Sequence, residues 1–311
     1  MVRFLVVFLF FFVVLVASLR RPLRIFAACA FHGREWATAE LCQSWKRQYE
    51  TYLQATDGSV LPEVEWIIVS DVNRWGIQQA RDVGHACSRS NTNGVDLNRN
   101  YPIPTACKQS LFHTELVRNS TLPDGEEYAG PDPFSEAETR SLVETIEQHA
   151  PIDIAFFVHT GDELVLTPFD ACWEAPENYE HQLRLARWLN HTANLRVRAI
   201  GAGMTTLYPA TGTATDYVHS YLDVPFVFTL ETYRLPTECA DLYPGLSSMP
   251  TAEMNAHQCR LTFVPRHGSD CDTDDLSAYV RRWSRLFDAI LELVRNEKDR
   301  ETLWRWIGER Q

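Results

Sequence analysis

Short apolar segments alternate with longer segments of helical periodicity along this chain, and this alternation most constrains its fold. The apolar segments are rich in Val, Ile and Phe, as buried sheet strands are. They cover residues 23–31, 64–72, 152–158, 163–167 and 224–231. Helical patterns cover residues 36–53, 135–149, 177–194 and 274–295. This alternation predicts one α/β domain: a three-layer α/β/α sandwich around a mixed, mostly parallel, doubly wound sheet.

Two of the expected helices carry additional signals. Ser135 and Glu138 have the spacing of a capping box, in which each side chain bonds the backbone of the other, so we expect a helix to open at Ser135. The last helical segment carries a continuous apolar stripe from Leu276 to Val294. Such a stripe predicts a helix that packs against the sheet.

The composition is that of an ordinary globular protein with an acidic balance. The chain has 311 residues, 45% apolar and 23% charged, with 41 Asp and Glu against 29 Lys and Arg. These values exclude a disordered or low-complexity chain. The formal net charge of −12 argues against a nucleic-acid partner, because nucleic-acid binders neutralise phosphates with Lys and Arg.

The first 19 residues differ from the rest because most of them are apolar. Residues 4–17 form an unbroken apolar run, preceded by Arg3 and followed by Arg20 and Arg21. The run is short for a membrane span of roughly 20 residues and fits a signal-peptide core of roughly 7–15 residues. It therefore predicts a secreted or secretory-pathway protein. An uncleaved membrane anchor, a buried strand and an aberrant start of the chain are the alternatives.

The cysteines and two sequons agree with secretion. The chain has an even number of cysteines and no CxxC pair, which predicts disulfide bonds of open connectivity. Cys29 lies in an apolar strand-like run, where we expect a free buried thiol. Asn119 and Asn190 begin Asn-x-Ser/Thr glycosylation sequons, which predict a glycoprotein. The eight cysteines are Cys29, Cys42, Cys87, Cys107, Cys172, Cys239, Cys259 and Cys271.

Polar side chains suited to catalysis stand where the predicted strands end. His32 follows the first strand, His159 follows the third, and Glu231 ends the fifth. In doubly wound sheets the site lies at the carboxyl ends of the strands, so these residues can meet there. His32 and Glu35 have an HxxE spacing, and imidazole and carboxylate both suit zinc. His159 is the candidate third ligand; an interior histidine with ordinary hydrogen bonds is the alternative.

Two common hydrolase motifs do not occur in the chain. It contains neither HExxH nor GxSxG. The first absence excludes the helical zincin arrangement, and the second argues against a serine hydrolase with a nucleophile elbow. A metal site built on strand ends is therefore the stronger hypothesis.

Six segments carry a resemblance to a known family, in the order in which that family has them. They are FHGREWATAELC (31–42), GVDLNRNYP (94–102), GPDPFSEAET (130–139), FFVHTGDELVLTPF (156–169), LYPATGTATDY (207–217) and FVFTLETYR (226–234). Together they resemble the motifs of the zinc metallocarboxypeptidases, or funnelins, over residues 23–294. The resemblance implies one Zn²⁺ per chain and an exopeptidase that releases a single amino acid from peptide or protein C-termini.

The resemblance assigns roles around the metal. His32, Glu35 and His159 match the three zinc ligands of the family. Glu231 matches the glutamate that acts as general base and then general acid, a role that a carboxylate beside the attacking water can fill. Arg89 matches the arginine that stabilises the oxyanion.

Other matched residues would bind the substrate. Asn98 and Arg99 match the pair that holds the terminal carboxylate, and the planar fork of an arginine suits this task. Tyr208 matches the mobile tyrosine that closes over the substrate. Arg34 matches a further substrate-side arginine, with a solvated structural arginine as the alternative.

Two positions bear on the preferred C-terminal residue. Thr215 matches the base of the pocket for the terminal side chain, where a small uncharged residue favours an apolar or neutral group. Asp170 matches a position that is acidic in the branch of the family that cleaves basic residues. An acid there favours Lys or Arg by charge pairing. An aspartate in a turn, facing solvent, is the alternative.

The start of the chain departs from the family pattern. Family catalytic domains carry two strands and a helix before the metal motif, whereas 31 residues precede His32 here. The sheet then either lacks its N-terminal edge strands or has them replaced by the apolar segment. We expect a signal peptide or anchor at 1–19, a catalytic domain at 20–296 and a C-terminal tail at 297–311. This leaves no room for a folded activation peptide.

The presence of all three ligands and the base favours a metallocarboxypeptidase that turns over substrate. The alternative is a catalytically impaired or truncated carboxypeptidase-like binding protein. We expect a monomer that contacts a membrane only if the N-terminal segment is uncleaved.

Overall fold

A computed structural model describes residues 21–56, 62–109, 120–242, 245–246, 249, 253–267 and 270–308. The apolar run at 4–17 and the sequon residue Asn119 lie outside these ranges, so the expectations for them stay predictions. Within the described ranges, no helix combines the length and apolar character needed to cross a membrane.

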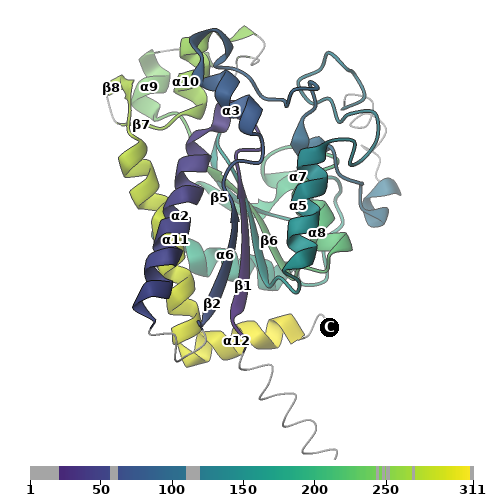
Figure 1. Cartoon of the computed structure of the whole chain (residues 1–311), viewed down its shortest axis with the longest axis vertical. Coiled ribbons are helices and arrows are strands. Elements are labelled where there is room, and N and C mark those ends of the chain that lie inside the picture. The colour runs from purple at the N-terminus through teal and green to yellow at the C-terminus, as the bar shows by residue number, and fades with distance from the viewer. Residues whose placement is uncertain are drawn as a thin grey trace, which may run out of the picture.

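Six strands form one mixed sheet in the order β2-β1-β3-β6-β4-β5 (Figure 1). β1, β2, β3 and β6 are parallel, while β4 pairs antiparallel with β6 and parallel with β5. β7 and β8 form a separate two-stranded sheet. The strands are β1 (Leu23–Cys29), β2 (Val64–Val69), β3 (Ile154–His159), β4 (Glu163–Thr167), β5 (Ala199–Ala202), β6 (Phe226–Thr232), β7 (Arg266–His267) and β8 (Asp270–Asp274). The predicted fold class is confirmed.

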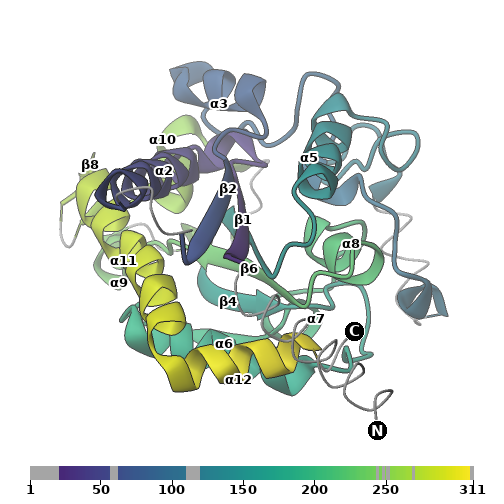
Figure 2. The ribbon, with the colours of Figure 1, turned by 60° about the horizontal axis from the view of Figure 1, so that its bottom comes forward.

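Helices cover both faces of the sheet and complete the three layers (Figures 1 and 2). α2, α6, α11 and α12 pack on one face, and α5 and α8 pack on the other. α3, α9 and α10 gather at one end of the sheet, at the top of Figure 1. The helices are α2 (Ala37–Ala55), α3 (Arg74–Arg81), α5 (Ala137–Gln148), α6 (Tyr179–Thr192), α7 (Gly203–Thr206), α8 (Ala214–Tyr221), α9 (Thr237–Leu242), α10 (Ala256–Phe263), α11 (Leu276–Arg295) and α12 (Glu297–Gly308).

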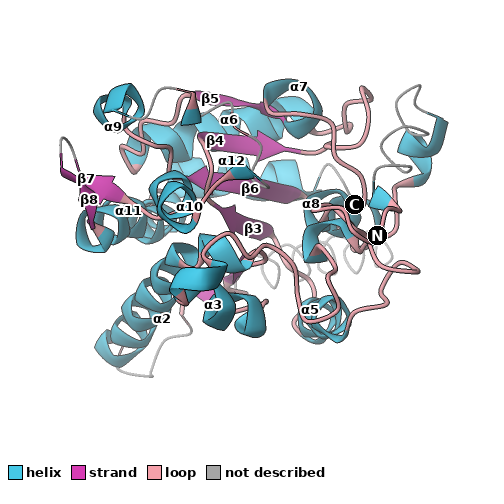
Figure 3. Cartoon of the chain, turned by 90° about the horizontal axis from the view of Figure 1, so that it is seen from above, coloured by secondary structure: helices cyan, strands magenta, loops and turns pink. Residues whose placement is uncertain are grey.

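Alternating side chains of β1, β2, β3 and β6 supply two hydrophobic cores. In β1, Ile25 and Ala27 face the core under α2 and α11, whereas Phe26 and Ala28 face the core under α5 and α8. The two-residue period of a strand causes this alternation, and burial on both faces explains the continuous apolar sequence. Seen from above, the strands lie between the two helical layers (Figure 3).

The capping box predicted at Ser135 is wrong. α5 begins at Ala137, and its N-cap residue is Glu136, which makes no side-chain cap hydrogen bond. Ser135 Oγ instead accepts a hydrogen bond from Asn100 Nδ2 at 2.9 Å and donates to Glu136 Oε1 at 2.8 Å. A contact with a distant asparagine therefore replaces the local cap, and the helix begins later than predicted.

The expected C-terminal tail is largely helical. α12 crosses beneath the sheet at the bottom of Figure 1, and its Leu303 and Ile307 are buried in the core of α2 and α11. The guanidinium of Arg21 lies 4.7 Å from the centre of the Trp304 ring. Residues 297–308 thus pack on the same core as the predicted catalytic domain.

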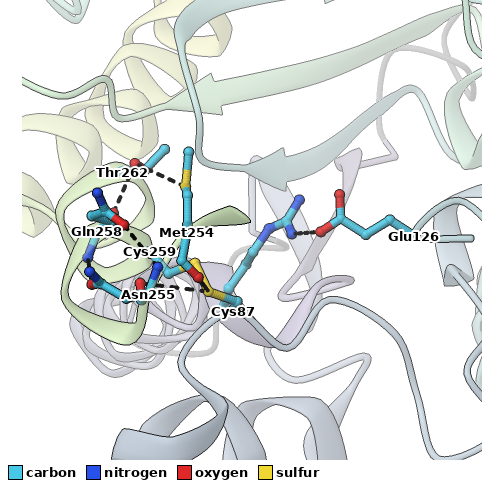
Figure 4. Close-up of a disulfide and its surroundings, with 8 residues drawn as sticks. Cys87, Glu126, Met254, Asn255, Gln258, Cys259 and Thr262 are labelled. Carbon is cyan, nitrogen blue, oxygen red and sulfur yellow. Dashed lines mark hydrogen bonds and ion pairs between the residues drawn. A yellow bond between two sulfur atoms is a disulfide. The ribbon is translucent and has the colours of Figure 1, made fainter. Parts of the chain in front are cut away.

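Three disulfides with both partners described brace the fold, which agrees with the predicted framework. Cys29 bonds Cys42, Cys87 bonds Cys259 (Figure 4), and Cys107 bonds Cys172. Cys239 is also disulfide-bonded, and no described cysteine is free. The expectation of a free thiol at Cys29 is therefore wrong, because α2 packs directly on β1 and brings Cys42 to it.

Candidate metal and substrate site

Ten of the eleven predicted site residues line one cavity of about 210 Å³ at the carboxyl ends of β1, β3 and β6. Parallel neighbours end at the same edge of a sheet, which is why residues far apart in sequence meet there. The ten are His32, Arg34, Glu35, Arg89, Asn98, Arg99, His159, Asp170, Tyr208 and Glu231. Thr215 does not line this cavity.

The three predicted metal ligands converge. His32 Nδ1 lies 2.7 Å from Glu35 Oε1, and His159 Nδ1 lies 3.0 Å from Glu35 Oε2. One ligand atom from each residue lies within 4.8 Å of the others, and all three residues are buried. Two imidazoles and a carboxylate are a usual donor set for catalytic zinc, so these residues fit a zinc ion.

The turn that follows β1 orients His32 and Glu35. Gly33 and Glu35 bound a 3₁₀ turn, and a Cβ on Gly33 would lie 2.3 Å from the Gly76 carbonyl oxygen. Glycine is therefore required for this close approach. Gly33 N also donates to Arg89 O at 3.1 Å, which ties the turn to a second segment of the cavity.

Asp96, which the sequence analysis did not single out, supports this centre. Its Oδ1 lies 3.0 Å from His32 Nε2, so His32 presents its other ring nitrogen to Glu35. Arg89 donates from Nε and Nη2 to Asp96 Oδ2 at 2.8 and 2.7 Å. Burial alone would raise the pKa of Asp96, but Arg89 and His32 hold it well below its usual range. Such partners fix the ring orientation of metal-binding histidines.

Charge also stabilises the ionised form of Glu35. Burial would raise its pKa, but the adjacent His32 and His159 lower it well below the ordinary value. Glu35 is therefore ionised at neutral pH, as a metal ligand must be.

Glu231 stands beside the ligands without joining them. It pairs in register with His159 across β6 and β3, and Thr232 Oγ1 donates to His159 O at 2.7 Å. Its Oε2 is buried and has no hydrogen-bond partner within the described structure. Burial raises the pKa of Glu231 to about 7, with Glu35 raising it further and His159 opposing. A carboxyl with a pKa near neutrality can both accept and donate a proton.

The expected substrate arginines are buried around the same cavity. Arg89 Nη1 lies 3.3 Å from His32 Nδ1, so this end of the guanidinium faces the predicted metal ligands. Arg99 Nη1 donates to Asn98 O at 3.0 Å, and Asn98 Oδ1 accepts from Ala214 N at 3.0 Å. Tyr208 is 46% exposed at the rim, as a side chain that moves over a ligand needs to be.

Arg34 is buried rather than solvated, and its substrate-side role stays a prediction. It is 5% exposed, and its guanidinium lies 4.3 Å from the centre of the Phe263 ring. Its Nη1 pairs with Glu126, while its Nε has no partner among the described residues. Burial and the charge of Arg89 lower its pKa, against the opposing charges of Glu126 and Glu35.

The two predicted specificity residues have different positions. Asp170 is 7% exposed and lines the cavity, so the solvent-facing alternative is wrong. Burial raises its pKa to about 6, and a Cβ on Gly203 would lie 1.7 Å from its Oδ1. Thr215 is fully buried and shares a 2.5 Å hydrogen bond with Thr229, which does line the cavity. The pocket-base role of Thr215 stays a prediction, because its contact with the cavity lining is through Thr229.

The fold and the site together define a class: an α/β protein whose described residues bring together a His-Glu-His triad able to hold a metal ion, with a carboxylate beside it. Residues 18–239 match the model of the family described as zinc carboxypeptidase. The chain therefore belongs to the zinc carboxypeptidase family.

The curated relatives that the chain resembles include carboxypeptidases. Carboxypeptidase B of Rattus norvegicus is 29% identical over 225 residues, which are 67% of this chain and 51% of that protein. Carboxypeptidase B of Astacus astacus is 26% identical over 242 residues, 74% of this chain and 76% of that protein. The chain spans about half the length of the first relatives it matches.

The structural neighbours share the fold. Bovine thrombin-activatable fibrinolysis inhibitor, in complex with tick carboxypeptidase inhibitor, has a TM-score of 0.60 at 20% identity; the match covers 86% of this chain and 83% of that chain. Carboxypeptidase A from Helicoverpa armigera has a TM-score of 0.57 at 18% identity, with coverages of 90% and 63%.

Proposed function

We propose that this protein is a zinc-dependent exopeptidase that hydrolyses the C-terminal peptide bond and releases one amino acid. One observation carries the proposal: a buried, unpartnered carboxylate oxygen of Glu231 and a buried Arg99 line the same cavity as the His-Glu-His triad. The first is suited to moving a proton and the second to binding a terminal carboxylate.

His32, Glu35 and His159 would hold the zinc ion. When bound, zinc polarises a carbonyl and lowers the pKa of water, which supports hydrolysis at neutral pH. Glu231 would take the proton of the attacking water and then donate it to the leaving amine. Its pKa of about 7, raised by burial, suits both steps.

Arg89 would stabilise the oxyanion. Its Nε and Nη2 are held by Asp96, so Nη1 is the donor that faces the metal triad. A donor fixed before the reaction stabilises developing charge without reorganisation, which is the basis of oxyanion holes.

Asn98 and Arg99 would bind the C-terminal carboxylate, with Tyr208 closing from the rim. The buried charge of Arg99 in the cavity lining favours a substrate that ends there with a carboxylate. This requirement distinguishes an exopeptidase from an endopeptidase, whose cleft must accept chain on both sides. The partners are then peptide and protein C-termini.

Asp170 favours basic C-terminal residues. It is a buried carboxylate of the cavity lining, and Gly203 has no side chain that would collide with its Oδ1. A lysine or arginine side chain could pair with it there. The apolar N-terminal run and the disulfides support a secreted protein, and Asn190 is a predicted glycosylation site.

Release of free Lys, Arg, Phe and Glu from N-blocked dipeptides, with and without a chelator, tests this function. We expect release that the chelator abolishes and added zinc restores. Release of Phe without release of Lys or Arg would overturn the role of Asp170. A folded, zinc-loaded sample that releases no amino acid would overturn the enzyme itself.

A further inference from the structure

Two adjacent glutamates of one loop, neither of them predicted from the sequence, pair with arginines of the cavity lining. Glu127 Oε1 accepts a hydrogen bond from Arg99 Nη2 at 2.6 Å, and Glu126 forms an ion pair with Arg34. Figure 4 shows the Glu126 carboxylate at this contact. Both arginines line the cavity that holds the metal triad.

The backbone fixes Glu127 beside Arg99. The next residue, Tyr128, accepts a hydrogen bond from Asp96 N at 2.7 Å through its carbonyl oxygen. Asn100 Nδ2 donates to Ala129 O at 2.7 Å. The loop is therefore hydrogen-bonded to the segment that carries Arg99, both before and after Arg99. The contact between Glu127 and Arg99 follows from this arrangement.

The two partners of this ion pair differ in exposure. The Arg99 side chain is 4% exposed, whereas the Glu127 side chain is 43% exposed. A buried guanidinium without a counter-charge is costly, so Arg99 needs a carboxylate when no ligand is bound. Burial would lower the pKa of Arg99, but Asp96 and Glu127 are among the groups that raise it. Glu127 can leave the pair at small cost because its own carboxylate already reaches water.

We infer that Glu127 is an internal competitor: its carboxylate occupies Arg99 in the free enzyme and is displaced by the terminal carboxylate of the substrate. The inference rests on the proposed function, since it assigns Arg99 to that terminal carboxylate. Glu127 balances the positive charge of Arg99 when no substrate is bound. It also raises KM, because the substrate must displace it.

The test compares Glu127→Gln with Asp124→Asn and the wild type. Asp124 is an exposed carboxylate of the same loop, so its variant makes the same charge change without touching Arg99. We expect Glu127→Gln to lower KM for an N-blocked dipeptide about two- to sixfold with little change in kcat, as loss of a partly exposed ion pair predicts. Asp124→Asn should leave KM at the wild-type value.

Equilibrium binding separates this inference from the function. Free L-lysine and L-phenylalanine, used as carboxylate probes in calorimetry with the zinc-loaded protein, should bind Glu127→Gln about two- to sixfold more tightly than wild type. If the probes bind Glu127→Gln more tightly than wild type but none of the three proteins turns over substrate, Glu127 competes for Arg99 and the proposed function is wrong. If both proteins turn over substrate and Glu127→Gln has the KM and probe affinity of wild type, only the inference about Glu127 is wrong. A higher KM in Glu127→Gln also overturns it, because Glu127 would then position Arg99 for the substrate.

Discussion

The two sides of the cavity are built differently. The metal side, formed by His32, Glu35, His159 and Glu231, lies at or just beyond the ends of neighbouring strands. The substrate side is assembled from loops around Arg99, and it includes contacts between segments remote in sequence. Backbone pairing of the sheet thus places the metal side, whereas hydrogen bonds between loops, from both backbone and side chains, place the substrate side.

This structural difference predicts that the metal side determines the chemical step and that the substrate side determines affinity and preference. A residue at a strand end has its position fixed by the register of the sheet, so its removal should abolish a chemical step. A loop residue adjusts with its partners, so its removal should change affinity or preference.

Glu231→Gln should lower kcat about a thousandfold, which is within the range for loss of a general acid-base residue. The amide keeps the shape of the side chain and cannot accept the proton. Zinc content, measured by metal analysis, should stay at one per chain because Glu231 is outside the triad. A variant that retains turnover would show that another group moves the proton.

Arg99→Gln should lower kcat/KM about a hundredfold, mostly through KM, because it removes a buried charge that binds substrate. Steady-state kinetics on free-acid and amidated dipeptides gives the control. The amidated substrate lacks the terminal charge, so its rate should change little. Equal losses for both substrates would mean that Arg99 supports the fold of the loop rather than the carboxylate.

The metal side could be predicted from the sequence because its signals are local. His32 and Glu35 lie three residues apart after an apolar run, and His159 and Glu231 close two further runs. The strand patterns located most of the sheet for the same reason, and β4 has its predicted bounds. β5 was missed because Ala199–Ala202 is four residues long and contains a glycine, too short for an apolar pattern.

The substrate side could be predicted only through family motifs. Glu126 and Glu127 have no pattern in sequence, and they matter only because hydrogen bonds from Asp96 and Asn100 hold their loop. Asp96 could have been found, since it stands two residues before Asn98 in the same motif. The motif could not show that Thr215 contacts the cavity lining through Thr229 of strand β6, because that hydrogen bond joins residues from different elements.

Asp170→Asn should lower the preference for Lys over Phe about tenfold at pH 7.5, through loss of one charge pair. Burial raises the pKa of Asp170 from 3.8 to about 6, so in wild type the preference should fall as pH drops through about 6. The ratio of kcat/KM values for the two substrates, measured from pH 5 to pH 8, checks this. A wild-type ratio that does not vary with pH contradicts the assignment.

The same residue should cost stability at neutral pH. The pKa of Asp170 is higher in the folded than in the unfolded protein, so its protonated form adds stability at low pH. This contribution is lost as pH rises from about 4 to about 6. Asp170→Asn should therefore raise the free energy of unfolding at pH 7.5 by about 1–3 kcal/mol and change it little at pH 3.5. Denaturant unfolding at both pH values measures this, and destabilisation at pH 7.5 would contradict it.

Thr215→Val should have the smallest effect on selectivity and tests whether the Thr215 position is separate from the cavity. The change leaves the buried Thr229 hydroxyl without its partner, so the free energy of unfolding should fall by about 1–3 kcal/mol. The Lys-to-Phe preference should change less than twofold, because Thr229 still lines the cavity.

A double-mutant cycle isolates that hydrogen bond. Thr229→Val alone should alter both stability and preference, since it changes the cavity wall. Combining it with Thr215→Val should recover most of the lost stability, because replacing both hydroxyls leaves no unpaired group. Additive losses of stability would mean that the two hydroxyls do not depend on each other. If Thr215→Val alone changes the Lys-to-Phe preference, Thr215 contributes to the base of the pocket, as its motif predicts.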